Sequence, residues 1–196
     1  MFDIKALFLR AMLALTMLGT VPAALANPVY YHVTIDTAQW AGSTGWLDFG
    51  FNGPGDPGAG ARVDGLSGDF TSELKLAGDT AGNVLDGFTL GNQTGYNFID
   101  QGVNFGGLFS FRVALEDFGG DNGMLFSVAL FNEDFSSYLG AAADLLTIER
   151  VPGLADTVEV PGQGVSVSAV PEPADWLLVA SGLLLIGLTR RKAARR

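Results

Sequence analysis

The chain of 196 residues contains no cysteine and a single histidine. Without cysteine there is no disulfide, no thiol nucleophile and no thiolate metal ligand. The single histidine, His32, shares the polar side of an alternating run with Tyr30, Thr34 and Asp36, which is typical of an exposed strand residue and not of a catalytic base. No G-x-S-x-G or H-E-x-x-H motif occurs in the sequence. We therefore expect a protein that is not an enzyme, with no catalytic residue and no metal ligand to assign.

Basic residues are also scarce, with 11 Lys and Arg against 21 Asp and Glu and a net charge of -10. Seven of the 11 basic residues lie in the first ten or the last seven positions, whereas 18 of the 21 acidic residues lie between positions 27 and 169. Nucleic-acid binding depends on Lys and Arg side chains that neutralise phosphates. An acidic middle between basic ends argues against nucleic acid as a partner.

The N-terminus has the three parts of a secretory signal peptide. Lys5 and Arg10 precede an apolar run over residues 11–18, and a break at Gly19 and Pro22 leads to a small-x-small site. The expected signal peptide covers residues 1–26, and its cleavage site is formed by Ala24, Ala26 and Asn27. The mature chain would begin at Asn27.

The C-terminus reads as a short membrane anchor. A helix over about residues 174–189 would span about 24 Å, against about 30 Å for the hydrocarbon core of a bilayer. Trp176 at one end and arginines at the other are the residues that anchor a short helix at the two interfaces. By the positive-inside tendency the basic tail stays cytoplasmic and the body faces outward. The residues that set this topology are Arg190, Arg191, Lys192, Arg195 and Arg196.

The arrangement of Pro171-Glu172-Pro173, a short Leu/Gly-rich helix and an Arg-rich terminus resembles the PEP-CTERM sorting signal of Gram-negative bacteria. This resemblance covers residues 170–196. It implies recognition by an exosortase, a membrane-embedded cysteine transpeptidase-like enzyme, during transfer from the inner membrane to the outer surface or the extracellular (biofilm) matrix. The runs Y-x-V-x-I-D at 31–36 and W-L-D-F-x-F at 46–51 also resemble the ectodomains of some PEP-CTERM proteins, which have no activity to transfer.

The body, residues 27–169, is rich in glycine and in short runs of β-forming residues. Eight such runs at fairly even spacing predict an all-β fold, a jelly-roll-like or similar antiparallel β-sandwich, flanked by the signal helix and the transmembrane helix. The runs cover residues 29–36, 45–51, 63–75, 84–90, 107–116, 124–131, 145–151 and 164–170. Residues 136–144 are expected to form a short helical turn.

The clearest run has Phe109, Phe111, Val113 and Leu115 on one face and polar residues on the other. Period-two alternation predicts a strand with one buried face. Residues 124–130 repeat the pattern after a turn-rich segment, so the two runs are expected to form a β-hairpin.

Three functions remain open for the body. Calcium binding is one, because hard cations take several oxygen ligands, and loops rich in Asp, Asn and Gly lie at 52–56, 79–83 and 117–122. Carbohydrate binding is the second, since exposed aromatic side chains can stack on sugar rings. Glycoside hydrolysis by a pair of carboxyl groups is the third. The candidate aromatic residues are Tyr30, Trp40, Trp46 and Tyr96, and the candidate acid pairs are Glu116 with Asp117 and Glu133 with Asp134.

Taken alone, the sequence predicts an exported structural or interaction protein of the cell surface or extracellular matrix, held transiently in the inner membrane and processed by an exosortase. No cofactor is expected, with calcium as the one open possibility. The alternatives are a carbohydrate-binding module that associates with exopolysaccharide and, in a different class, a carboxylate-pair glycosidase.

Overall fold

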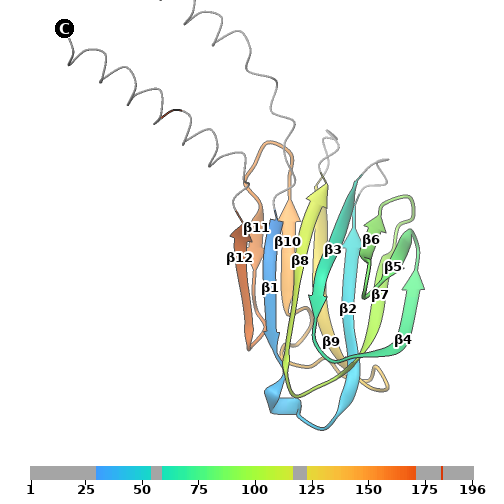
Figure 1. The fold of residues 1–196 in the computed structure, drawn as a ribbon. Helices are drawn as coiled ribbons and strands as arrows, with labels where there is room; N and C mark the ends of the chain where they lie inside the picture. The colour runs from blue at the N-terminus through green and yellow to red at the C-terminus, as the bar shows by residue number, and fades with distance from the viewer. Residues whose placement is uncertain (1–29, 54–58, 117–122, 171–181, 183–196) are drawn as a thin grey trace, which may run out of the picture.

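A computed structural model describes residues 30–53, 59–116 and 123–170, together with Gly182. These residues form two antiparallel sheets of six strands each, which lie face to face as a β-sandwich (Figure 1). Sheet A has the strand order β12-β1-β8-β3-β6-β5, and sheet B has the order β11-β10-β9-β2-β7-β4. The expectation of an all-β sandwich is therefore confirmed. The elements are β1 (Tyr30–Asp36), the 3-10 helix η1 (Ala38–Trp40), β2 (Thr44–Asn52), β3 (Gly60–Ser67), β4 (Phe70–Ala77), β5 (Thr80–Asn83), β6 (Gly87–Gly91), β7 (Asn97–Asn104), β8 (Leu108–Glu116), β9 (Met124–Asn132), β10 (Leu146–Arg150), β11 (Thr157–Glu159) and β12 (Val165–Val170).

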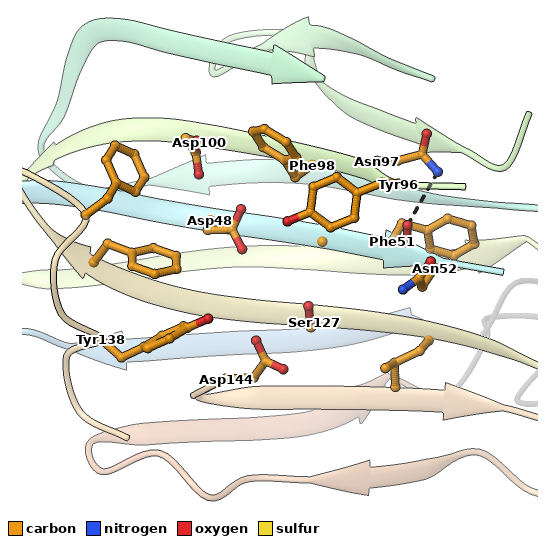
Figure 2. Close-up of a pocket in the computed structure, with 14 residues that line it drawn as sticks. Asp48, Phe51, Asn52, Tyr96, Asn97, Phe98, Asp100, Ser127, Tyr138 and Asp144 are labelled. Carbon is orange, nitrogen blue, oxygen red and sulfur yellow. Dashed lines mark hydrogen bonds between the residues drawn. The ribbon is translucent and has the colours of Figure 1, made fainter. Parts of the chain in front are cut away.

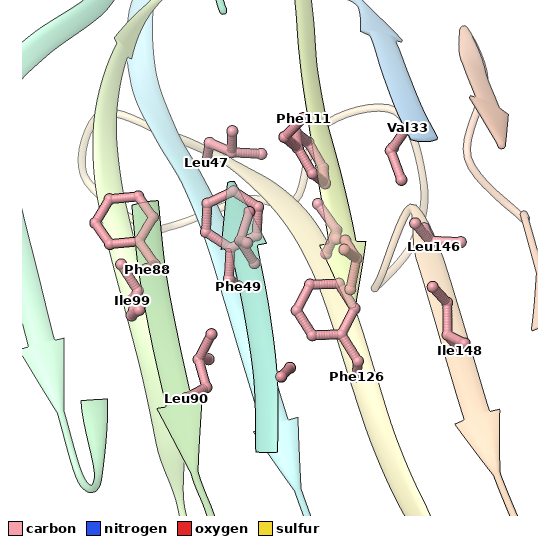
Figure 3. Close-up of a cluster of buried hydrophobic side chains, with 14 of the residues drawn as sticks. Val33, Leu47, Phe49, Phe88, Leu90, Ile99, Phe111, Phe126, Leu146 and Ile148 are labelled. Carbon is pink, nitrogen blue, oxygen red and sulfur yellow. The ribbon is translucent and has the colours of Figure 1, made fainter. Parts of the chain in front are cut away.

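The core lies between the sheets and consists mainly of aromatic and branched side chains (Figure 3). Phe49 of β2 is fully buried and contacts rings from both sheets. Its ring centroid lies 5.1 Å from that of Phe111 in an edge-to-face arrangement and 5.9 Å from that of Phe88. Aromatic rings of this size remove much apolar surface from water, so a core of this kind needs no disulfide.

The two clearest runs of the sequence are strands with the expected buried faces, but they do not form a hairpin. β8 pairs with β1 and β3 in sheet A, whereas β9 pairs with β2 and β10 in sheet B. The alternation of apolar residues identifies which side chains enter the core, and the apolar faces of both strands do pack in the same core. Alternation does not identify the sheet to which a strand belongs, and the predicted pairing of these two strands is therefore wrong.

Other strand boundaries also differ from the prediction. The run 63–75 is two strands, β3 and β4, in different sheets, because the chain turns at Gly68. Gly68 has a φ of +153°, and a β-carbon there would overlap the ring of Phe109, so glycine is required. The strands β5, β7 and β11 were not among the predicted runs. The segment 136–144 contains bends and one bridge residue, Tyr138, in place of the expected helical turn.

A buried ion pair joins the two sheets. Arg150 of β10 makes two hydrogen bonds to the carboxylate of Asp156, at 2.8 Å from Nε and 2.7 Å from Nη2. Its Nη1 donates to the carbonyl of Leu115 in β8, and the hydroxyl of Tyr31 in β1 donates to Asp156 at 2.5 Å. Burial acts to raise the pKa of Asp156, but the hydrogen bonds from Arg150 and Tyr31 and the charge of Arg150 outweigh it, so the pKa is lowered. The cluster therefore links sheet B to two strands of sheet A.

The predictions made for the two ends fall on residues that the structure does not describe. These are the signal peptide with Ala24, Ala26 and Asn27, the motif Pro171, Glu172 and Pro173, and the basic tail with Arg190, Arg191, Lys192, Arg195 and Arg196. Within residues 30–53, 59–116 and 123–170, no helix has the length and apolar character needed to cross a membrane.

Candidate functional site: a groove on the outer face of sheet B

The outer face of sheet B carries a groove of about 390 Å³ (Figure 2). Its position follows from the alternation along β2. Leu47, Phe49 and Phe51 point into the core, so Asp48 and Gly50 lie on the opposite face. The neighbouring strands β7 and β9 bring their own outward residues beside them. The groove is lined by Asp48, Gly50, Phe51, Asn52, Tyr96, Asn97, Phe98, Asp100, Leu125, Ser127, Phe131, Phe135, Tyr138 and Asp144.

One row of side chains crosses three strands at the centre of this face. Lys75 of β4 is the register partner of Asp100 in β7, and Asp100 is the register partner of Asp48 in β2. Directly opposed residues on one face of an antiparallel pair have side chains in contact range. Figure 2 shows the carboxyl groups of Asp48 and Asp100 turned toward each other. Two carboxyl groups this close hold one proton between them.

The pair titrates far from the ordinary range of aspartate. Burial raises the pKa of Asp48 to about 8, and the nearby carboxylates of Asp100 and Asp144 add to the rise. Burial also raises the pKa of Asp100, and this rise outweighs the opposite effects of Asp48 and of the charge of Lys75. Because the rise is larger at Asp48, we assign the shared proton of the pair to Asp48.

A third carboxyl group faces the pair across β9. Asp144 lies immediately before Leu145, whose backbone N–H donates to the carbonyl of Val128 in β9. Burial raises the pKa of Asp144 as well. Between Asp144 and Asp48 the sheet carries only small side chains, those of Ala129 and Ser127 on β9. The depth of the groove depends on this small-residue floor.

Aromatic rings stand at both ends of the groove. Tyr96 is 69% exposed, and its ring lies edge-on to Phe98 at a centroid distance of 5.2 Å. Tyr138 is 44% exposed and packs on Phe131 at 4.4 Å. In Figure 2 the hydroxyl groups of the two tyrosines point toward the middle of the groove from opposite sides. The rings therefore offer both a flat apolar surface and a polar group to an occupant.

The segment between β9 and β10 forms the wall on the Tyr138 side. Phe135 adopts a φ of +59°, which is unusual for a residue other than glycine. The turn is held by Asn132, whose backbone carbonyl accepts from the N–H of Phe135 and whose Oδ1 accepts from the N–H of Ser137. This conformation places the Phe135 ring on Trp46, with ring centroids 5.0 Å apart. The ammonium group of Lys75 lies 4.0 Å from the centroid of each of these two rings.

The four aromatic residues proposed from the sequence do not form one row. Tyr96 lines the groove, but Trp46 lies buried beneath Phe135, with its indole N–H donating to the carbonyl of Glu133. Trp40 packs on Phe105 at a centroid distance of 6.0 Å, and Tyr30 belongs to sheet A. The groove instead combines Tyr96 with Tyr138 and Phe98, which sequence reasoning missed.

The acid pairs proposed from the sequence are not the acid pair of the groove. Glu133 and Asp134 lie on the exposed turn after β9, and Glu116 ends β8 in the other sheet. Asp117 lies outside the described residues. Residues next to each other in a strand face opposite ways, whereas Asp48 and Asp100 are 52 positions apart and meet through the register of β2 and β7.

His32 is exposed on the outer face of sheet A, opposite Arg112 and Ser168. Of the three loops proposed for calcium, residues 79–83 include the turn between β4 and β5, where the Asp79 carboxylate accepts from the N–H of Gln93. Residues 54–56 of the loop at 52–56 and all of the loop at 117–122 lie outside the described residues. Across the part of the chain that the structure describes, no three acidic or histidine side chains are grouped as a metal site requires.

One signal for the groove was present in the sequence. Asp48 interrupts the aromatic and aliphatic run of β2, and an acidic residue within such a strand lies on the side opposite the core residues. Nothing in the sequence placed Asp100 beside it, because that contact depends on the pairing of β2 with β7. No protein-family model, curated protein or solved structure matches this chain.

Proposed function

We propose that the chain is an exported protein of the cell surface or extracellular matrix whose β-sandwich binds carbohydrate in the groove of sheet B. The observation that carries the binding role is the groove itself, which places two exposed tyrosines around three carboxyl groups. Tyrosine rings supply stacking surfaces, and carboxyl groups accept hydrogen bonds from hydroxyl groups. Pockets of a few hundred Å³ with a few converging polar groups are typical ligand sites.

Export and sorting rest on the two terminal sequences. Residues 1–26 have the pattern of a signal peptide, and residues 170–196 resemble a PEP-CTERM signal with a helix over about 174–189. In this proposal the inner membrane holds the precursor until an exosortase processes it, after which the sandwich reaches the outer surface. Mass spectrometry of the mature protein tests both ends. An N-terminus at Asn27 is expected, and a chain intact through Arg196 in cells that possess an exosortase would contradict processing.

Carbohydrate binding is tested with a panel of neutral and charged oligosaccharides by isothermal titration calorimetry. Replacing Tyr96 with alanine removes the most exposed ring of the groove and is expected to weaken binding about tenfold, the loss of one aromatic contact worth about 1–1.5 kcal/mol. The matched control is Tyr30→Ala on sheet A, which lies outside the groove. Equal binding by both variants, or no binding of any oligosaccharide, would overturn the proposal.

A glycosidase is the second candidate, because a general acid requires a carboxyl group with a raised pKa, and the pKa of Asp48 is raised to about 8. The direct opposition of Asp48 and Asp100 in the register of β2 and β7 favours binding over hydrolysis. Glycosidase carboxyl groups stand about 5–10 Å apart so that the scissile bond, or the bond and a water, fits between them. Release of reducing sugar that is lost in Asp48→Asn while binding is retained would establish the enzyme.

A further inference from the structure

The charge of the groove restricts what it can bind. Its lining contributes three aspartates, from β2, from β7 and from the segment before β10, and no Lys or Arg stands among the lining residues that the structure describes. The nearest cation is Lys75 beside Asp100, and its ammonium group already lies against the rings of Trp46 and Phe135. An anionic occupant would meet carboxylates without a compensating cation. The groove is therefore suited to a neutral or a cationic ligand.

The position between Asp48 and Asp100 favours the cationic one. Asp100 is only 6% exposed, and its carboxyl group faces that of Asp48 at the floor of the groove. Two carboxyl groups in contact need a positive charge between them, either a proton or a cation from the ligand. An ammonium group has three donors and the compact charge to take that place. Asp144 faces the same space from across β9, and between them β9 contributes only the uncharged Ser127 and Ala129.

The aromatic side chains point to a sugar that carries this ammonium group. Tyr96 and Tyr138 flank the carboxyl groups on opposite sides of the groove, with their hydroxyl groups directed to its centre. Their rings attract cations through the face and pack against the C–H face of a sugar ring. We propose that the groove binds an amino sugar whose ammonium group lies between the carboxyl groups of Asp48 and Asp100. This proposal rests on the carbohydrate-binding function proposed above and names the class of sugar.

Binding of this kind exchanges one cation for another. At pH 6 the carboxyl pair holds one proton and the amine of the sugar is charged. When the ammonium group enters, the shared proton leaves Asp48 and passes to the buffer, so about one proton is released for each ligand bound. A neutral sugar leaves the proton in place and releases none.

The experiment compares three β-1,4-linked hexamers that differ only at carbon 2 of each ring, namely glucosamine, N-acetylglucosamine and glucose. Calorimetry at pH 6 in two buffers of different ionisation enthalpy gives both the affinity and the number of protons released. The glucosamine hexamer is expected to bind at least about tenfold more tightly than the other two, as a hydrogen bond to a charged group predicts, and to release a proton. Equal affinity for all three hexamers would overturn the amino-sugar proposal while leaving carbohydrate binding intact. The absence of any binding would overturn both.

Two further experiments locate the site and distinguish recognition of a sugar from recognition of positive charge alone. Asp48→Asn keeps the size of the side chain and is expected to abolish proton release and weaken binding of the glucosamine hexamer about tenfold. Glu159→Gln removes one negative charge from the exposed strand β11 of the same sheet, outside the groove, and is expected to change neither. Unaltered proton release in Asp48→Asn would overturn the assigned position. Tetralysine that binds as tightly as the glucosamine hexamer would show recognition of charge alone and would overturn the assignment to a sugar.

Discussion

Asp48 connects the stability of the sandwich to its surface chemistry. Burial and the neighbouring Asp100 both favour the protonated form of its carboxyl group. The contribution of Asp48 to the free energy of unfolding therefore falls as the pH rises, whereas that of most ion-paired aspartates rises with pH.

The sign follows from the two pKa values of Asp48, about 8 in the folded chain against the ordinary aspartate value of 3.8 in an unfolded one. Between these values the folded state binds more protons, so stability falls as pH rises, by up to about 1.4 kcal/mol per pH unit for one proton. We predict that Asp48→Asn flattens this slope and makes the protein more stable at pH 8. Urea unfolding at pH 5, 6.5 and 8 measures it. Asp69→Asn, at an exposed position, is the control, and parallel slopes for wild type and Asp48→Asn would contradict the prediction.

Arg150 is the second residue whose environment decides its energetic role. Its side chain is only 8% exposed, forms an ion pair with Asp156 and donates a hydrogen bond to the carbonyl of Leu115. The carboxylate of Asp156 also accepts a hydrogen bond from the hydroxyl of Tyr31. Removing one partner of a buried ion pair leaves the other charged group without compensation.

We predict that Arg150→Ala lowers the free energy of unfolding by about 3–5 kcal/mol, as truncation of buried pairs does. Arg62→Ala is the matched control, because the Arg62 side chain is 50% exposed in its pair with Asp64 and such pairs contribute about 0–1 kcal/mol. Chemical denaturation of both variants at pH 7 makes the comparison. Because the pKa of Asp156 is lowered, its contribution is present above the unfolded pKa and is lost as the pH falls through the folded value. Equal destabilisation by the two substitutions would refute a special role for the buried pair.

At the scale of elements, the groove depends on where small residues occur along β2 and β9. Gly50 and Ala129 have little or no side chain, so the sheet surface between Asp48 and Asp144 is recessed. A β-carbon added at position 50 would come too close to one atom, Ser127 Oγ. The strands β7 and β2 then carry their functional side chains on a rigid surface and not on loops, which holds the carboxyl pair in place.

We predict that Gly50→Ala weakens ligand binding in the groove more than it weakens the fold, because the added methyl group raises the floor and displaces the Ser127 hydroxyl. The contrasting variant is Gly68→Ala, where a positive φ and the Phe109 ring leave no room and where the cost appears as a loss of stability. Melting temperatures and binding isotherms of the two variants separate the effects. The prediction is contradicted if Gly50→Ala binds as wild type does.

Some elements could be predicted from the sequence and others could not, for identifiable reasons. The faces of β8 and β9 follow directly from their alternating apolar residues. β7 was missed because its sequence, NFIDQGVN, has polar residues on both faces. Gln101 faces inward and donates hydrogen bonds from its Nε2 to the carbonyls of Thr71 and Glu73, while Asp100 faces the groove. A strand that carries part of the site lacks the regular pattern by which strands are recognised.

At the scale of the whole molecule, the two sheets share one core and have no separate interior. Phe49 of sheet B contacts Phe88 and Phe111 of sheet A, and the Arg150 cluster links the same two sheets at another place. A sandwich built this way is expected to unfold as one cooperative unit.

We predict a single unfolding transition with the same midpoint by tryptophan fluorescence and by far-ultraviolet circular dichroism. Phe49→Ala is expected to lower that midpoint, because truncating a buried phenylalanine usually lowers the free energy of unfolding by about 3–5 kcal/mol. Phe98→Ala, on the half-buried outer face, is the control with the smaller expected effect. Two separated transitions would show that the sheets fold independently.

The sequence by itself determined which side chains of the clear runs enter a core, the acidic character of the body and the patterns at both termini, because alternation, charge and order along the chain are local properties. Only the tertiary structure decided which strands are neighbours. The pairing of β8 and β9 with different sheets, the junction of Tyr31 with Asp156 and the meeting of Asp48 with Asp100 all join residues far apart in the chain. Such contacts depend on strand order and register, which are set by the packing of the whole core and not by any one segment.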